Sequence, residues 1–530
     1  MNAPSVPIQV LRSRRGALAD RLRREFDGEV LFDRASRGRY ATDASIYQVE
    51  PLGIAVPRSE DAARVAIAIA AEEGVPILPR GAGSSQCGQA VGEALLIDHT
   101  KHLNQIIEVD GQRAIVQPGV VLDQLNAVLR PKGLWFPVDV STSAQATIGG
   151  MAGNNSCGSR SIAYGNMVHN VLAIDACTVG GERWRFGPMD EASGPPAYHA
   201  FVRRLKDLYQ REQAEIEARF PKLLRKVAGY NLDHLGPPHA NAAHLLVGSE
   251  GTLAYSERLH LKLSRIPARR ALGVCHFAKF HSAMDLTQHI VKLAPSAVEL
   301  VDRTMIGLAR EIPAFRRTVD AFIRGDPEAI LLVEFSGEED QLPRLKQLTA
   351  LLGDLGMPGS VVEIADAAAQ RELWEMRKAG LNIMMSMKGD GKPVSFIEDC
   401  AVPLEHLAEY TARLTAVFEK HGTRGTWYAH ASVGTLHVRP ILDMRRDGAV
   451  KMRAIAEEAC AMVKQYKGAY SGEHGDGLVR SEWIAPFFGP RLTAALGEIK
   501  SWLDPRGLMN PGKIVDPPKM DDASLFRFKP

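Results

Sequence analysis

The chain has 530 residues, of which 45% are hydrophobic and 24% are charged, and its formal net charge is +2. At roughly 150 residues a domain, this length predicts three or four domains, and the apolar content excludes a disordered or collagen-like chain. The near balance of charge gives no reason to expect nucleic acid or an anionic membrane surface as a partner.

The six cysteines are scattered, and no two of them form a C-x-x-C pair. This spacing excludes a cluster or zinc ribbon built on neighbouring cysteines, and it fits buried thiols in a reducing compartment. No apolar run approaches the roughly 20 residues of a membrane span. We therefore expect a cytoplasmic protein without a membrane span, and a peripheral association with the bacterial inner membrane stays open.

The first half of the chain predicts short strands that alternate with helices. Residues 1–45 are expected to be helical and irregular. Apolar runs between Gly, Pro and Asp predict strands, and helical spacing of apolar residues predicts helices. The expected strands are 75–78, 94–97, 106–109, 114–117, 171–179, 244–247 and 255–263, and the expected helices are 59–73, 121–130 and 195–227.

A second pattern begins near Arg269. Two β-α-β units in tandem predict a ferredoxin-like split sheet, with strands 272–280, 297–301, 329–335 and 360–364 and helices 281–293 and 342–355. Further helices are expected at 367–387, 404–420 and 447–466. We divide the chain into an N-terminal helical segment 1–45, a domain 46–266, a substrate or cap domain 267–465 and a C-terminal segment 466–530.

Three glycine-rich segments stand out in the first half. Residues 79–88 read PRGAGSSQCG directly after a predicted strand, residues 147–158 read TIGGMAGNNSCG, and residues 247–253 read VGSEGTL. Glycines let backbone N–H groups approach an anion closely, although a single glycine-rich loop is more often a plain turn. The second segment is too rich in Gly and Asn for a core helix, which favours contact with a flat or phosphorylated ligand.

These segments, in this order, resemble the vanillyl-alcohol oxidase / p-cresol methylhydroxylase (PCMH) superfamily of FAD enzymes. The resemblance implies an α+β fold with a PCMH-type two-subdomain FAD-binding domain, a ferredoxin-like cap domain and a small helical C-terminal region. Ser84 and Ser85 stand where some members carry an attachment histidine, so non-covalent FAD is implied. The FAD-binding residues that the resemblance implies are Arg80, Gly81, Ala82, Gly83, Ser84, Ser85, Gly88, Pro118, Gly119, Thr147, Gly150, Asn154, Gly158, Gly248, Glu250, Gly251 and Asn510.

Two segments in the second half carry metal-ligand residue types. His430 and His437 flank a predicted turn, so a hairpin would make them face each other across two strands. Glu473 lies in the glycine-rich loop 471–477. Two histidines and one carboxylate suit a divalent metal with open positions, and the alternative is three unrelated polar residues in loops.

The hairpin and this loop together resemble the FAD-dependent D-2-hydroxyacid dehydrogenases, which include D-2-hydroxyglutarate and flavin D-lactate dehydrogenases. The resemblance implies that His430, His437 and Glu473 bind zinc or a similar ion and that His474 is the general base. It implies hydride transfer from the substrate to flavin N5, with release of a 2-oxoacid.

Three cations are candidates for binding the substrate. The resemblance places Arg377 and Lys392 at carboxylates, whereas Arg439 replaces an Asn that many hydroxyglutarate enzymes carry. A second carboxylate would offset the cost of an extra buried cation, so we expect D-2-hydroxyglutarate ahead of D-lactate. The segment 430–439, which contains both histidines and Arg439, resembles a bacterial branch of this family whose members often carry a fused iron–sulfur half.

The expected electron acceptor is a quinone, an electron-transfer flavoprotein or an iron–sulfur protein, and a homodimer stays open. Three alternatives remain at this point. They are a non-redox FAD enzyme of the alkylglycerone-phosphate synthase kind, a non-haem iron oxygenase, and a flavin subunit of a larger electron-transfer complex. The oxygenase would leave the glycine-rich half unexplained.

Overall fold

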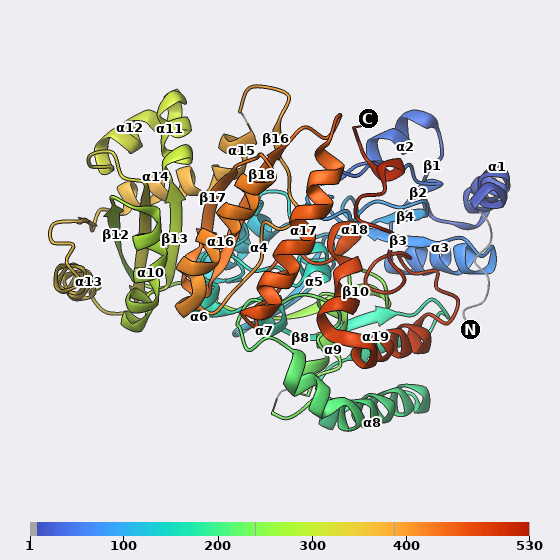
Figure 1. Cartoon of the computed structure of the whole chain (residues 1–530). Helices are drawn as coiled ribbons and strands as arrows, with labels where there is room; N and C mark the ends of the chain where they lie inside the picture. Colours follow the sequence, from blue (N-terminus) through green and yellow to red (C-terminus); the bar gives the residue numbers. More distant parts are fainter. Residues whose placement is uncertain (1–7, 239, 386, 529–530) are drawn as a thin grey trace.

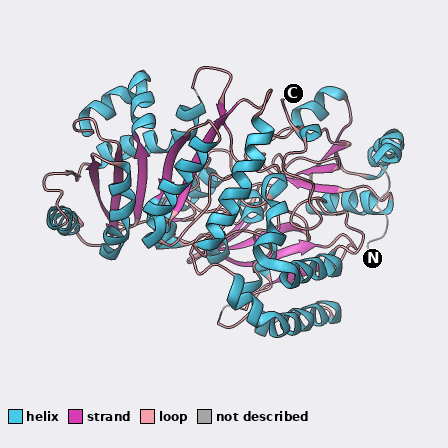
Figure 2. Ribbon diagram, viewed as in Figure 1, coloured by secondary structure: helices cyan, strands magenta, loops and turns pink. Residues whose placement is uncertain are grey.

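The computed structural model describes residues 8–238, 240–385 and 387–528, which form two adjoining parts (Figure 1). Residues up to about 265 build two larger sheets and one two-stranded sheet, and the following residues build a third large sheet with its own helices (Figure 2). None of the helices in these ranges is both long enough and apolar enough to cross a membrane.

The first sheet has four strands in the order β1-β2-β4-β3. Strands β2, β4 and β3 run parallel, and all five residues of β2 are buried, as expected for a parallel strand covered on both faces. Helix α3 starts after Ser59, whose side chain accepts a hydrogen bond from the Ala62 N–H. The elements are α1 (Ile8–Glu25), β1 (Gly28–Leu31), α2 (Arg34–Tyr40), β2 (Gly53–Pro57), α3 (Glu60–Glu72), β3 (Ile77–Arg80) and β4 (Leu95–Asp98).

The second sheet has five antiparallel strands in the order β5-β6-β10-β8-β9. The four-stranded and the five-stranded sheet form the two expected subdomains of the first part. The elements are β5 (Ile106–Asp110), β6 (Arg113–Val116), α4 (Leu122–Leu129), β7 (Leu134–Trp135), α5 (Ile148–Asn154), α6 (Ser161–Tyr164), α7 (Met167–Asn170), β8 (Val171–Cys177), β9 (Arg183–Phe186), α8 (Pro196–Arg219), α9 (Ala243–Leu246), β10 (Tyr255–Lys262) and β11 (Ser264–Arg265).

The third sheet has seven strands in the order β15-β12-β14-β13-β17-β18-β16. Its first four strands have the ferredoxin-like order that the tandem β-α-β pattern predicts, and the β17–β18 hairpin extends them. The elements are β12 (Arg269–Phe277), α10 (Phe280–Ile290), β13 (Ala297–Asp302), α11 (Arg303–Glu311), α12 (Pro313–Phe322), β14 (Ala329–Gly337), α13 (Leu342–Asp354), β15 (Val361–Ile364), α14 (Ala367–Lys378), α15 (Gly380–Met385), β16 (Lys392–Pro393), α16 (Leu407–Lys420), β17 (Gly425–His430), β18 (Thr435–Leu442) and α17 (Gly448–Gln465).

The two faces of this sheet pack against different helices. On β13, Val298 and Leu300 join the core cluster that includes α10, α13 and α16, whereas Ala297 and Val301 join the cluster that includes α11 and α14. The strand period of two therefore puts Glu299 on the α14 face. The polar residues of the hairpin share that face.

The C-terminal segment returns to the first part of the chain. After α18 (Gly477–Arg480) and α19 (Ile484–Leu503), Met509 pairs with Ile77 of β3, and Phe526 pairs with Tyr47. The sequence-based boundaries at 45, 266 and 465 stay predictions.

Several sequence-based elements differ from the structure. The predicted helix 195–227 is α8, which ends at Arg219, and the segment 1–45, expected to be helical and irregular, contains strand β1. The predicted strand 244–247 is the short helix α9, which follows a turn where the Asn241 side chain accepts a hydrogen bond from the Ala243 N–H. A fully apolar run of this length has no period that separates strand from helix. The single predicted helix 367–387 is two helices, α14 and α15, which break where Gly380 packs against Met305.

Candidate active site

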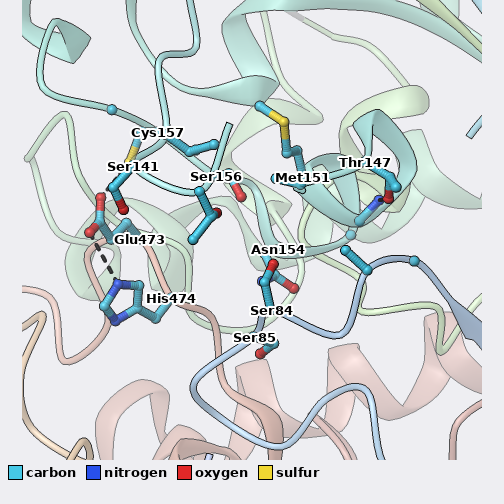
Figure 3. Close-up of a pocket in the computed structure, with 18 of the residues that line it drawn as sticks. Ser84, Ser85, Ser141, Thr147, Met151, Asn154, Ser156, Cys157, Glu473 and His474 are labelled. Atoms are coloured by element: carbon cyan, nitrogen blue, oxygen red, sulfur yellow. Dashed lines mark hydrogen bonds and ion pairs between the residues drawn. The ribbon is translucent and has the colours of Figure 1, made fainter. Parts of the chain in front are cut away.

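A cavity of about 500 Å³ lies between the two parts of the chain. Its walls combine the glycine-rich segments of the first part with side chains from α14, the β17–β18 hairpin and the 471–477 loop. In Figure 3, Ser84, Ser85 and Asn154 lie between Thr147 on one side and Glu473 and His474 on the other. Seventeen residues predicted from the sequence line it: Gly81, Ala82, Gly83, Ser84, Ser85, Pro118, Thr147, Gly150, Asn154, Gly158, Glu250, Gly251, Arg377, His430, His437, Glu473 and His474.

The loop after β3 presents backbone to the cavity. Gly83 has a φ of +68°, and a Cβ there would collide with the Arg80 guanidinium. Arg80 itself is buried behind the loop, where it donates to the backbone oxygens of Thr42 at 2.9 Å and Ala90 at 2.5 Å. Arg80 therefore fixes the shape of the loop from outside the cavity lining.

The start of α5 forms the facing wall. The Thr147 side chain accepts a hydrogen bond of 3.3 Å from the Gly150 N–H, and a Cβ on Gly149 would strike Pro118. His99 also lines this wall, and neither of its ring nitrogens has a hydrogen-bond partner within the described residues. Burial lowers the pKa of His99 to about 4, so the ring is neutral and offers one donor and one acceptor. Bare backbone walls and an unpartnered buried imidazole fit a flat, polar-edged group such as a flavin.

Other residues predicted at the FAD site act as supports. Glu250 accepts hydrogen bonds from the N–H groups of Asp476 at 2.6 Å and Gly477 at 2.9 Å, and burial raises its pKa to about 8. Asn510 donates to the backbone oxygens of Gln89 and Glu250, at 3.0 and 2.7 Å, without lining the cavity. Three further predicted residues lie outside the lining, namely Gly88, Gly119 and Gly248.

The β17–β18 hairpin brings the two histidines together. Tyr428 pairs with His437, and His430 pairs with Thr435, so the histidines are diagonal neighbours on one face rather than direct cross-strand partners. Their ring centroids are 4.8 Å apart. The turn between them depends on Gly434, which has a φ of +68° and lies against the Val402 backbone oxygen.

Glu473 reaches both histidines from the C-terminal segment. Its Oε1 lies 2.9 Å from His437 Nε2, and its Oε2 lies 3.5 Å from His430 Nε2. One ligand atom from each of the three residues falls within 4.8 Å of the others, and all three residues are buried. Burial alone would raise the pKa of Glu473, but Arg225 and the two histidines hold it well below its usual value. This donor set fits a divalent metal.

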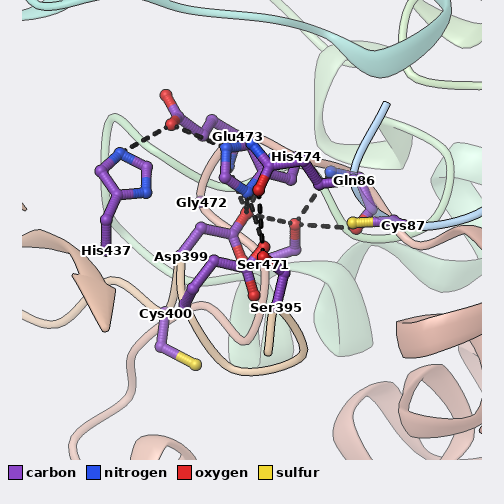
Figure 4. Close-up of polar contacts among 12 residues, drawn as sticks. Gln86, Cys87, Ser395, Asp399, Cys400, His437, Ser471, Gly472, Glu473 and His474 are labelled. Carbon is purple, nitrogen blue, oxygen red and sulfur yellow. Dashed lines mark hydrogen bonds and ion pairs between the residues drawn. The ribbon is translucent and has the colours of Figure 1, made fainter. Parts of the chain in front are cut away.

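His474 lies next to Glu473 (Figure 4) and contacts a second glutamate through its other ring nitrogen. Its Nδ1 lies 2.7 Å from Glu398 Oε1, and its Nε2 lies 3.2 Å from Glu473 Oε1. Burial opposes protonation, but the hydrogen bonds with Glu398 and Glu473 raise the pKa of His474 to about 10. Arg480, fully buried, pairs with both Glu398 and Asp399.

The three predicted substrate cations are placed differently. Arg377 lines the cavity and is 5% exposed. Arg439 is fully buried and lies outside the cavity lining, where it donates to Tyr428 Oη at 2.7 Å and Gln86 Oε1 at 2.9 Å. Lys392 lies outside the lining and donates to the Met387 backbone oxygen at 2.6 Å. The other cations that line the cavity are Arg130, Arg160, Arg270, Arg371 and Lys378, which the sequence analysis did not single out.

Comparison with known proteins identifies the class. Residues 51–187 match a family model described as an FAD binding domain, and residues 266–514 match one described as the C-terminal domain of FAD linked oxidases. The chain therefore contains matches to both an FAD binding domain and the C-terminal domain of FAD linked oxidases. The solved structure of p-cresol methylhydroxylase with substrate bound aligns with a TM-score of 0.69 over 96% of each chain at 15% identity, which confirms the PCMH-type fold.

Two curated relatives resemble most of the chain. The D-2-hydroxyglutarate dehydrogenase of Escherichia coli (strain K12) is 34% identical over 95% of this chain and 52% of its own length. The glycolate oxidase subunit GlcD of Bacillus subtilis (strain 168) is 27% identical over 92% of this chain and 95% of its own length. The chain thus spans about half the length of the D-2-hydroxyglutarate dehydrogenases that it matches.

Proposed function

We propose that the chain is a FAD- and divalent-metal-dependent dehydrogenase that oxidises a D-2-hydroxyacid to the 2-oxoacid. The proposal rests on the observation that two sets of residues line the same cavity. Glycine-rich backbone suited to FAD forms one wall, and His430, His437 and Glu473 form another. Neither a plain electron-relay subunit nor a non-redox flavin enzyme needs a metal donor set beside the flavin.

The residues present fit both groups. Gly81, Gly83 and Gly150 leave room for FAD, and His430, His437 and Glu473 would hold zinc or a similar ion. When bound, FAD accepts the hydride that leaves the substrate Cα. The cation, when bound, supplies positive charge that lowers the pKa of a substrate hydroxyl and favours the neutral form of His474.

His474 is the residue that accepts the hydroxyl proton. Its Nδ1 is held by Glu398, so Nε2 is the nitrogen that faces Glu473. A base has to be within hydrogen-bond reach of the proton it removes, and Nε2 lies beside the proposed metal ligands. Arg377 orients the substrate by a charge-assisted hydrogen bond to its carboxylate.

We place D-2-hydroxyglutarate ahead of D-lactate as the substrate. Five cations line the cavity in addition to Arg377, namely Arg130, Arg160, Arg270, Arg371 and Lys378, whereas four acids line it, namely Asp139, Glu250, Glu375 and Glu473. This surplus of positive charge suits a dicarboxylate. Lys392 and Arg439, outside the lining, contribute to the proposal only as supports of the site.

The electrons pass to an acceptor other than oxygen, of the quinone, electron-transfer flavoprotein or iron–sulfur kind, in the cytoplasm. All six cysteines are free and buried, which supports that compartment.

A panel of D-2-hydroxyacids with an artificial dye as acceptor tests the proposal. We expect dye reduction with the D-acids, not with their L-enantiomers, and a higher kcat/KM for D-2-hydroxyglutarate than for D-lactate. Failure of every D-2-hydroxyacid to reduce the bound flavin would reject the dehydrogenase. A clear preference for D-lactate would reject only the dicarboxylate.

A further inference from the structure

One glutamate lies where the sheet should be apolar. Glu299 is in the middle of β13, between Val298 and Leu300, and its side chain is fully buried. A buried carboxylate is costly unless it is paired and hydrogen-bonded. We propose that Glu299 is the positioning residue of the metal site, holding the ring of His430 so that one nitrogen points to the metal. The inference rests on the proposed function, because that function supplies the metal.

The contacts of Glu299 define what it does. Its Oε1 lies 2.7 Å from His430 Nδ1, and its Oε2 lies 2.5 Å from Arg377 Nη2. A carboxylate only accepts, so His430 carries its hydrogen on Nδ1 and keeps the lone pair of Nε2 free for a metal. Arg377 fixes the second oxygen, which stops the carboxylate from turning away.

The strand register places the side chains of Glu299 and His430 next to each other. Glu299 of β13 is the direct cross-strand partner of His430 of β17, on the same face of the sheet. A shift of one residue would turn Glu299 to the opposite face and break the contact. His437 has no such support, since its Nδ1 has no hydrogen-bond partner within the described residues. Glu299 therefore acts on one of the two histidine ligands.

The chain offers a matched control on the neighbouring strand. Glu334 of β14 lies opposite Ala297, is fully buried, and pairs with an arginine, Arg160, at 2.6 Å. It has the same charge, burial and kind of partner, but it does not contact His430. Like Glu299→Gln, Glu334→Gln removes a buried carboxylate that pairs with an arginine, but it leaves the contacts of His430 unchanged.

The test measures metal affinity in flavin-loaded protein, without turnover. Zinc is titrated against a competing chelator for the wild type, Glu299→Gln and Glu334→Gln, and flavin content confirms the fold of each. Glu299→Gln should bind zinc 10–100-fold more weakly, the usual effect of losing the partner of a ligating histidine. It should also alter the visible absorption spectrum of the cobalt(II)-loaded protein. Glu334→Gln should bind zinc as the wild type does.

Wild-type zinc affinity in Glu299→Gln, or equal loss in both variants, would overturn the inference. If Glu299→Gln does not retain flavin, Glu299→Asp decides the matter, because its shorter carboxylate keeps the charge but draws back from Nδ1. Wild-type affinity in that variant would equally overturn the inference. A wild type that binds no divalent metal would overturn the metal proposal as well, and the wild-type titration alone reveals that outcome.

Discussion

The contact between His474 and Glu398 determines which ring nitrogen of His474 can accept a proton. The contact of Nδ1 with Glu398 leaves Nε2 as the nitrogen directed to the metal ligands. Glu398 and Asp399 were not singled out from the sequence, although two adjacent acids in the otherwise apolar stretch 396–402 were a visible signal. Asp399 Oδ2 accepts hydrogen bonds from the N–H groups of Glu473 at 3.0 Å and His474 at 2.7 Å, which holds the loop 471–477 in place despite its glycines.

His474→Ala should keep FAD and metal but lose flavin reduction by roughly 10²–10⁴-fold, the usual contribution of a general base. Single-turnover reduction by the D-hydroxyacid, followed at the flavin absorbance, measures this loss. His421→Ala is the control, because His421 also pairs with a glutamate, Glu458 at 2.6 Å, but outside the cavity lining. An unchanged reduction rate in His474→Ala would remove it from the mechanism.

Gly83→Glu should give colourless protein. The residue has a φ of +68°, a Cβ there would strike Arg80, and a carboxylate would oppose the phosphates of FAD. Gly111→Glu is matched, since Gly111 also has a positive φ, of +52°, but faces open space away from the lining. The absorbance ratio of flavin to protein measures the outcome, and yellow Gly83→Glu protein would mean that this loop does not approach the cofactor.

At the scale of elements, the hairpin β17–β18 carries two of the three metal ligands. Gly434→Ala should separate His430 from His437, because a Cβ would collide with the Val402 backbone oxygen at a left-handed turn. We expect substoichiometric zinc by elemental analysis and normal flavin content. Gly422→Ala, also at a positive φ but with no neighbour within 4 Å, should retain full zinc. Full zinc in Gly434→Ala would show that the turn can relax.

The second sheet contains a pH-sensitive contact. Asp175 of β8 lies 2.6 Å from Arg185 of β9 and 3.0 Å from His260 of β10. Burial alone would raise the pKa of Asp175, but the hydrogen bonds of His260 and Arg185 lower it to about 2. A carboxyl whose pKa is lower in the folded protein stabilises it above the unfolded pKa, and this contribution is lost as pH falls toward 2.

Asp175→Asn should therefore lower the thermal midpoint by a few degrees at pH 7, corresponding to roughly 2 kcal/mol. The difference from wild type should shrink steadily below about pH 4. Asp190→Asn removes a surface carboxylate whose pairing with Lys206 is largely exposed, and it should change little at any pH. A difference between Asp175→Asn and wild type that does not vary with pH would contradict the ionic origin.

Sequence periodicity predicted most elements, and the exceptions have physical causes. The four-strand core of the third sheet followed from apolar runs, but its extension by the hairpin did not, because pairing between distant strands leaves no local pattern. Glu299 was hidden in the predicted strand 297–301, where one acid among apolar residues was the available signal. The glycine-rich segments identified the cavity wall, whereas His99 carried no pattern at all.

At the scale of the whole molecule, the two halves of the site come from different parts of the chain. The cavity-lining residues of the first part precede residue 257, and the proposed metal ligands follow residue 429. Removal of the metal by a chelator should therefore leave the flavin content unchanged and abolish dye reduction, with recovery on adding zinc. Full activity in a preparation shown by elemental analysis to be metal-free would contradict the metal role.

The pairing of the chain end with the first sheet has a consequence for biosynthesis. A ribosome releases the chain from its N-terminus, and domains generally fold as they emerge. Glu473 appears only after the hairpin, and Met509, the partner of Ile77 in β3, appears later still. The nascent chain therefore exposes two histidines without their carboxylate and a first sheet without its last bridge. The complete metal donor set and the last bridge of the first sheet are therefore available only after residues 473 and 509, respectively, have emerged from the ribosome.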